Sequence, residues 1–178
     1  MPLNATQGAD FKAYARNPET WVFAAKRSLA VAGVLHARRE ELRLMRTADA
    51  FEVAGCHHAA GLYSASAIEN ALKGNFIAND PEIVTSDGLK LPKVFGRSGH
   101  ALLPPLLQLF GTVTEDELRL AKKLEEFSWA GRFVVPFSAE SIYNEETLQL
   151  MRTELPHEFT LVEAIVCRLL SRLTSNAA

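Results

Sequence analysis

The sequence has few cysteines and little charge imbalance, and each shortage argues against a class of protein. Cys56 and Cys167 are its only cysteines, which indicates a reducing compartment and two thiols that pack as small apolar side chains. A disulfide between them is the less favoured alternative. The formal net charge of −2 argues against strong electrostatic binding of nucleic acid or acidic membranes, although a local basic patch stays open.

Export signals and long apolar runs are also lacking. The opening residues MPLNATQGADF have no basic region followed by an apolar run, so we expect no secretory signal. The longest uncharged stretch, near residues 98–114, is interrupted by Pro104, Pro105 and Gly111 and is too broken to span a bilayer. We therefore expect a cytoplasmic protein without a membrane partner.

The composition is that of a soluble globular protein, with 48% apolar and 22% charged residues. A chain of 178 residues is long enough for a good core, and we expect a single domain over residues 1–178. There is no internal repeat and no low-complexity tract.

Helix signals recur along the chain and predict an all-α, up-down bundle of four to six helices. The six predicted helices cover about residues 18–46, 50–78, 98–110, 114–130, 139–154 and 160 onward, and a short helical piece at 10–15 precedes them. Asn17 caps the first long helix, and capping boxes open the helices at Thr114 and Thr160. The pair Pro104-Pro105 either kinks its helix or delays the start to Pro104.

The remaining segments read as connections. Residues 80–98 form a long loop with a turn at 86–88, where Asp87 precedes Gly88. Strand-like alternation is absent apart from a short extended piece at 133–137.

The helix predicted at residues 50–78 organises the chain because it is the most apolar. Ile68, Leu72 and Phe76 recur every four residues along one side. Glu69 and Lys73 lie within the same stretch at the spacing of a helical ion pair. Charges in a buried helix need partners, so these two residues are candidates for a site.

Three short motifs, in this order, resemble those of a HEPN domain, the helical family named for higher eukaryotes and prokaryotes nucleotide-binding. They are AIENALKG at residues 67–74, GHAL at 99–102 and WAGRFVVP at 129–136. The likeness covers a core of about residues 18–137, and residues 139–178 form an added C-terminal helical pair. Pro104-Pro105 departs from the family, which usually continues its helix there.

The resemblance implies a homodimer that binds a nucleotide or RNA, and we expect no cofactor. A nucleotidyltransferase is a further candidate partner protein. The positions that match the motifs are Glu69, Lys73, His100, Trp129 and Arg132. We favour a buried polar network that fixes how three helices meet. The alternative is that the same groups line a cleft for a nucleotide or RNA phosphate.

RNA-cutting members of the family carry an arginine and a histidine on one helix, with four to six residues between them. Arg152 and His157 match that spacing, and they could stabilise a phosphorane and serve as a general acid or base. Pro156 stands between them and should break the helix that would orient them. Catalysis by this pair is therefore the alternative hypothesis.

Other constellations carry less weight. Cys56, His57 and His58 suggest a metal, but Glu69 lies three helical turns away and cannot share it, so we expect no metal site. A Walker loop and a G-x-G-x-x-G motif are both missing from the sequence. The arginines at 38, 39, 43 and 46 form either a solvated helix end or a basic face for phosphate, and interleaved Glu40 and Glu41 favour the first.

The favoured hypothesis is a non-catalytic, HEPN-like binding or assembly module. A metal-independent endoribonuclease that uses Arg152 and His157 is the alternative. A small-molecule binder with a pocket among the middle helices is a third, weaker possibility.

Overall fold

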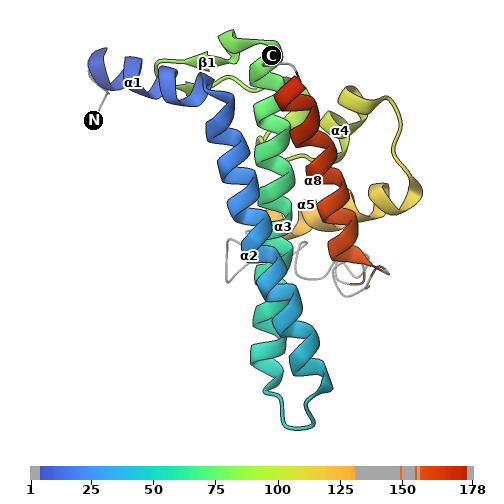
Figure 1. Ribbon diagram of the computed structural model, residues 1–178. Coiled ribbons are helices and arrows are strands. Elements are labelled where there is room, and N and C mark those ends of the chain that lie inside the picture. Colours follow the sequence, from blue (N-terminus) through green and yellow to red (C-terminus); the bar gives the residue numbers. More distant parts are fainter. Residues whose placement is uncertain (1–4, 131–148, 150–154, 156, 176–178) are drawn as a thin grey trace.

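The computed structural model describes residues 5–130, 149, 155 and 157–175, which contain six α-helices and a two-stranded sheet. The α-helices are α1 (Ala5–Arg16), α2 (Pro18–Leu44), α3 (Ala50–Asn79), α4 (Leu103–Phe110), α5 (Glu115–Ala130) and α8 (Glu158–Ser175). This confirms the predicted all-α architecture. Figure 1 shows α2 and α3 as a long antiparallel hairpin, with α8 running beside α3.

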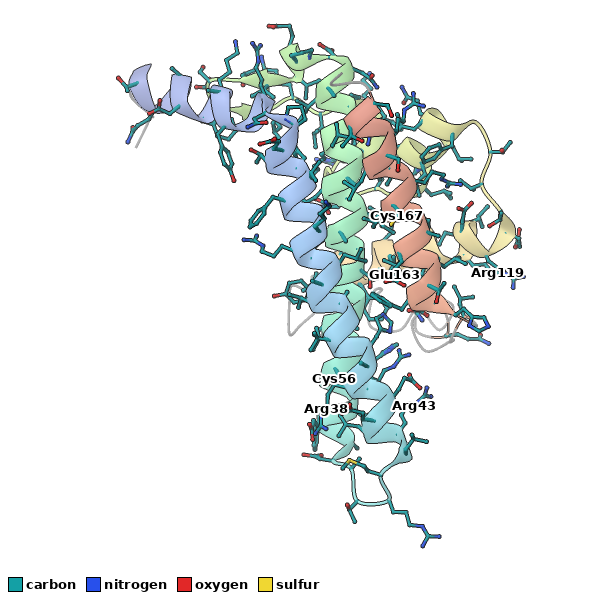
Figure 2. All side chains as sticks on the ribbon, in the orientation of Figure 1. Arg38, Arg43, Cys56, Arg119, Glu163 and Cys167 are labelled. Atoms are coloured by element: carbon teal, nitrogen blue, oxygen red, sulfur yellow. The ribbon has the colours of Figure 1, made fainter. Side chains whose placement is uncertain are left out.

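Each helix of the α2–α3 hairpin begins with a side-chain cap. Asn17 accepts a hydrogen bond from the Glu19 N–H at 3.0 Å, and Asp49 accepts one from the Phe51 N–H at 2.9 Å. Such caps satisfy N–H groups that have no partner within the helix. The far end of the hairpin extends past the start of α8, where Arg38, Arg43 and Cys56 are labelled in Figure 2.

Helix α3 is the centre of the core because α2, α5 and α8 all pack on it. Glycines let its neighbours approach closely: a Cβ on Gly61 would lie 2.6 Å from the Phe127 ring, and one on Gly74 would lie 2.7 Å from Trp21 Cβ. Asn75 Nδ2 donates to the backbone oxygen of Leu169 at 2.9 Å, which ties α3 to α8. The predicted apolar side of α3 is buried, as expected.

The connection between α3 and α4 is more ordered than a plain loop. It contains the 3-10 helices η1 (Pro81–Ile83) and η2 (Lys93–Phe95) and an antiparallel pair of strands, β1 (Val84–Thr85) and β2 (Gly88–Leu89). The predicted turn at 86–88 joins these strands. The sequence did not predict these strands, because two residues are too few to show strand-like alternation.

Two helix starts differ from the first expectation. Helix α4 begins at Leu103 and not near residue 98, which agrees with the alternative that the proline pair delays the start to about Pro104, because prolines fit in the first turn, where an N–H is dispensable. Helix α8 begins at Glu158 rather than at the capping box of Thr160, so Thr160 lies inside the helix. The helix predicted at 139–154 and the extended piece at 133–137 lie outside the described residues.

Candidate functional site

The carboxylate of Glu69 binds two of the predicted site residues. Lys73 Nζ donates to Glu69 Oε1 at 2.5 Å, one helical turn further along α3. His100 Nδ1 lies 3.0 Å from Glu69 Oε2. Because an ionised carboxylate only accepts hydrogen bonds, Nδ1 of His100 carries the proton in this contact. Each carboxylate oxygen thus has a donor of its own.

The cluster of Glu69, Lys73 and His100 is largely shielded from water. The side chains are 9%, 12% and 24% exposed, respectively. Lys73 completes the helical ion pair expected from its spacing, and His100 joins it from a segment distant in sequence. The arrangement holds α3 against the connection that leads into α4, which is what a structural network would do.

His100 is placed by the tight turn that precedes α4. Gly96 and Gly99 adopt positive φ angles of 71° and 76°, which a glycine adopts without strain. The Leu102 and Leu103 N–H groups both donate to Glu125 Oε1, at 2.7 and 2.9 Å. A carboxylate on α5 therefore caps the start of α4 and fixes the residues beside His100.

The other predicted residues are placed only in part. Trp129 lies in the last turn of α5, and Arg132 lies outside the described residues. The structure thus joins Glu69, Lys73 and His100, while the predicted contribution of Arg132 stays a prediction.

The predicted catalytic alternative is likewise only half described. His157 is exposed, has a φ of 56° and precedes the first residue of α8. Its backbone oxygen accepts a hydrogen bond from the Leu161 N–H at 3.0 Å, so it takes part in starting that helix. Arg152 lies outside the described residues. In the described part, His157 has a structural role at a helix start.

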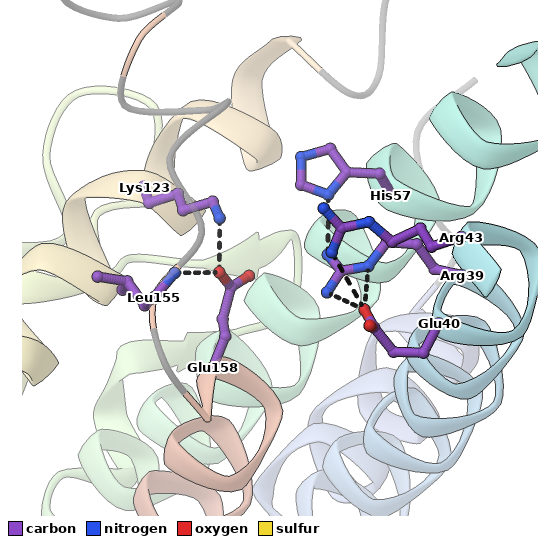
Figure 3. A network of polar contacts seen from close by, with 7 residues as sticks. All are labelled: Arg39, Glu40, Arg43, His57, Lys123, Leu155 and Glu158. Carbon is purple, nitrogen blue, oxygen red and sulfur yellow. Dashed lines mark hydrogen bonds and ion pairs between the residues drawn. The ribbon is translucent and has the colours of Figure 1, made fainter.

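Sequence reasoning missed a second polar network, drawn in Figure 3. Lys123 Nζ of α5 donates to Glu158 Oε2 of α8 at 2.5 Å, and the two side chains are only 1% and 6% exposed. A buried charge without a partner would be strongly destabilising, so this pair fixes α5 against α8. Lys123 follows Leu120 by three residues and precedes Phe127 by four, a spacing that could have revealed its inward position.

Figure 3 also draws a separate group of polar contacts, which centres on Arg39 of the α2–α3 hairpin. Its Nη1 lies 3.0 Å from His57 Nδ1, and its Nε and Nη2 donate to Glu40 Oε1 at 3.0 and 2.8 Å. Since arginine only donates, Nδ1 of His57 accepts, and the proton of the neutral ring resides on Nε2. Arg39 was expected on a solvated helix end, with a basic face as the alternative; it is instead a buried residue with partners on its own hairpin.

His36 is a buried histidine next to this network. Its ring centroid lies 5.0 Å from that of Phe159, and its Nε2 is buried without a hydrogen-bond partner. Burial, and then repulsion by the Arg39 guanidinium, lowers the pKa of His36 from 6.5 to about 4. His36 is therefore neutral at physiological pH.

Two kinds of site are absent from the part of the chain that the structure describes. It holds no group of three or more histidine, cysteine, aspartate or glutamate side chains that could bind a metal ion. His57 instead packs its edge on the Phe127 ring, with centroids 5.3 Å apart. None of the described helices has the length and apolar content required to cross a bilayer.

Comparison with known proteins does not assign this chain to a family. No protein-family model, curated protein or solved structure matches the chain. The likeness to HEPN domains therefore stays a prediction that depends on the three motifs.

Proposed function

We propose that the chain is a HEPN-like helical module that works by assembly rather than by catalysis, and that it forms a homodimer. The observation that carries this proposal is the apolar end of the α2–α3 hairpin. Leu44, Met45 and Phe51 are 88%, 53% and 86% exposed at the point where the two helices connect. Clustered apolar side chains at an exposed end are typical of protein contact surfaces.

The charges beside this apolar end favour a protein partner over a phosphate. Arg38 Nη2 lies 2.8 Å from Glu52 and its Nη1 lies 3.2 Å from Glu41. Arg43 lies 3.6 Å from Glu40. These cations already have carboxylate neighbours, so the solvated interpretation of the basic segment is better supported than a phosphate-binding face.

The interior cluster also supports assembly rather than chemistry. Both carboxylate oxygens of Glu69 are used by Lys73 and His100, which leaves them poorly placed to act on a substrate. The cluster instead holds α3, one arm of the hairpin, against the connection that leads into α4.

Analytical ultracentrifugation tests the assembly. We expect the wild-type protein to sediment at twice the 19.6 kDa mass of one chain and to dissociate on dilution. The double variant Leu44→Ser and Phe51→Ser should shift this equilibrium toward the monomer. Leu107→Ser is the matched control because Leu107 is an exposed leucine, 39% accessible, on α4. A wild-type monomer at all concentrations would refute the proposal.

RNA incubation tests the absence of catalysis. The wild-type protein and His157→Ala are each incubated with structured and unstructured RNAs without added metal. We expect no cleavage by either protein. Cleavage by the wild type that is lost in His157→Ala would establish the ribonuclease alternative. Binding of labelled nucleotide or RNA in the same samples tests the ligand that the resemblance implies.

A further inference from the structure

The face of α2 that points away from the core has a heptad pattern of its own. Seven residues, spaced alternately four and three apart, are all exposed: Phe23, Arg27, Ala30, Val34, Ala37, Glu41 and Leu44. We call them the outer seam. Its large apolar members Phe23, Val34 and Leu44 are 65%, 70% and 88% exposed. Alternating spacings of three and four keep one stripe of a helix facing a partner helix.

The outer seam lies opposite the face that α2 buries. The buried residues of α2 fall on a separate stripe: Ala25, Ser28, Ala32, His36, Arg39 and Leu42. At ~100° per residue, the centres of the two stripes are on opposite sides of the helix. Helix α2 therefore has apolar residues on two sides, and the fold of one chain buries only the inner side.

The charges of the outer seam are arranged symmetrically about its centre. Arg27 and Glu41 each lie one heptad from Val34, in opposite directions along α2. If two copies of α2 pair antiparallel about a twofold axis at Val34, Arg27 of each copy faces Glu41 of the other. A parallel pairing would instead place Arg27 against Arg27 and Glu41 against Glu41. Charge complementarity therefore selects a second copy of this chain, in the antiparallel orientation.

The apolar ends of the seam match under the same axis. Phe23 of one copy comes to lie opposite Leu44 and Met45 of the other, which covers side chains that are 65%, 88% and 53% exposed in the single chain. Glu41 already contacts Arg38, yet its side chain is 66% exposed, so it can accept a second cation. The seam is about 32 Å long at the rise of an α-helix, enough for an extended helix–helix contact.

We propose that two copies of the chain dimerise through the outer seam of α2, antiparallel, with the twofold axis at Val34. This inference rests on the proposed homodimer and adds its surface, orientation and axis. The hairpin end described above then becomes part of the same contact, because Leu44 belongs to both.

Charge reversal tests the orientation. Arg27→Glu and Glu41→Arg should each weaken the dimer at least about tenfold, because each creates two like-charge contacts per dimer. The double variant Arg27→Glu, Glu41→Arg should dimerise like the wild type, since it exchanges the two signs. An equimolar mixture of the single variants should form a heterodimer. Glu163→Arg on α8 is the control, because Glu163 is exposed on a different helix.

Cross-linking tests the axis in a background of Cys56→Ser and Cys167→Ser. After mild oxidation, Val34→Cys should form a disulfide with its own copy, since a residue on a twofold axis meets itself. Phe23→Cys should cross-link only when mixed with Leu44→Cys. Self-cross-linking of Phe23→Cys would indicate parallel pairing and overturn the inference.

The two proposals fail in different ways. A dimer that withstands both charge reversals and gives no Val34→Cys cross-link would overturn the outer seam but leave the homodimer intact. A wild-type monomer would overturn the proposed function, and the seam with it.

Discussion

Removing one partner of the buried ion pair between Lys123 and Glu158 should strongly destabilise the fold. The perturbation is Lys123→Met, which keeps the apolar stem and removes the charge. Glu158, 6% exposed at its side chain, would then keep a carboxylate in the interior with a long 3.5 Å contact to the Leu155 N–H. Removing one partner of a buried pair typically costs about 3–5 kcal/mol. For a domain of ordinary stability, about 5–15 kcal/mol, that is a large fraction of the total.

The double variant Lys123→Met, Glu158→Met distinguishes the loss of the ion pair from the cost of leaving the Glu158 carboxylate buried without a partner. With both charges replaced by apolar side chains of similar length, we expect stability within about 1 kcal/mol of the wild type. The coupling between the two sites would then be several kcal/mol. Urea unfolding followed by far-ultraviolet circular dichroism at neutral pH measures the wild type, the single variants Lys123→Met and Glu158→Met, and the double variant.

The exposed pair of Arg119 and Glu115 is the matched control on the same helix. Their closest atoms lie 3.2 Å apart, and the side chains are 57% and 69% exposed. Arg119→Met should cost no more than about 0.5 kcal/mol, because water solvates the remaining carboxylate. If Lys123→Met and Arg119→Met unfolded at the same urea concentration, the reasoning from burial would be wrong.

Three further predictions follow from other parts of the structure. Gly61→Ala should destabilise the fold by about 1–3 kcal/mol in urea unfolding, because its Cβ would lie 2.6 Å from a ring atom, whereas Gly55→Ala, with nothing within 4 Å, should gain about 0.5–1 kcal/mol. The unfolded chain binds a proton on His36 before the native one does, so the free energy of unfolding should fall by up to about 3 kcal/mol from pH 6.5 to about 4, and His36→Leu should remove that part of the fall. Glu69→Gln should cost about 1–3 kcal/mol in urea yet leave the sedimentation mass unchanged, whereas a changed mass would place the cluster in the assembly surface.

Local signals in the sequence were sufficient to predict the fold class and several helix starts. Asn17 caps α2 as expected. Thr114 and Glu117 exchange both hydrogen bonds of the predicted capping box, at 2.8 and 3.2 Å. These contacts join residues close in sequence, so their pattern is visible without a structure.

The exact starts of α4 and α8 depend on distant partners. The start of α4 is capped by Glu125, more than twenty residues away on another helix. The start of α8 at Glu158 coincides with the ion pair to Lys123. Neither partner can be recognised from the local sequence. For α8, the capping box at Thr160 was the stronger local signal, so the start was predicted there.

In the candidate site, too, the contacts between residues close in sequence were easier to predict than those between distant residues. The spacing of Glu69 and Lys73 predicted their ion pair, and the motif likeness brought in His100 from a distant segment. Lys123 was missed because lysine is seldom buried, although its position between apolar residues pointed inward.

The distribution of side-chain size on α2 supports the proposed dimer contact through its outer seam. The inner face presents Ala25, Ser28 and Ala32 to α3, and small residues there permit close approach of the two helices. Phe23 and Val34, which are larger, point outward and are 65% and 70% exposed. Burying a side chain of that size would stabilise the fold by about 1.5–3 kcal/mol, which the single chain forgoes at each position. One exposed apolar residue is ordinary, but a regular heptad of them with compensating charges is the pattern of a helix that meets a second helix.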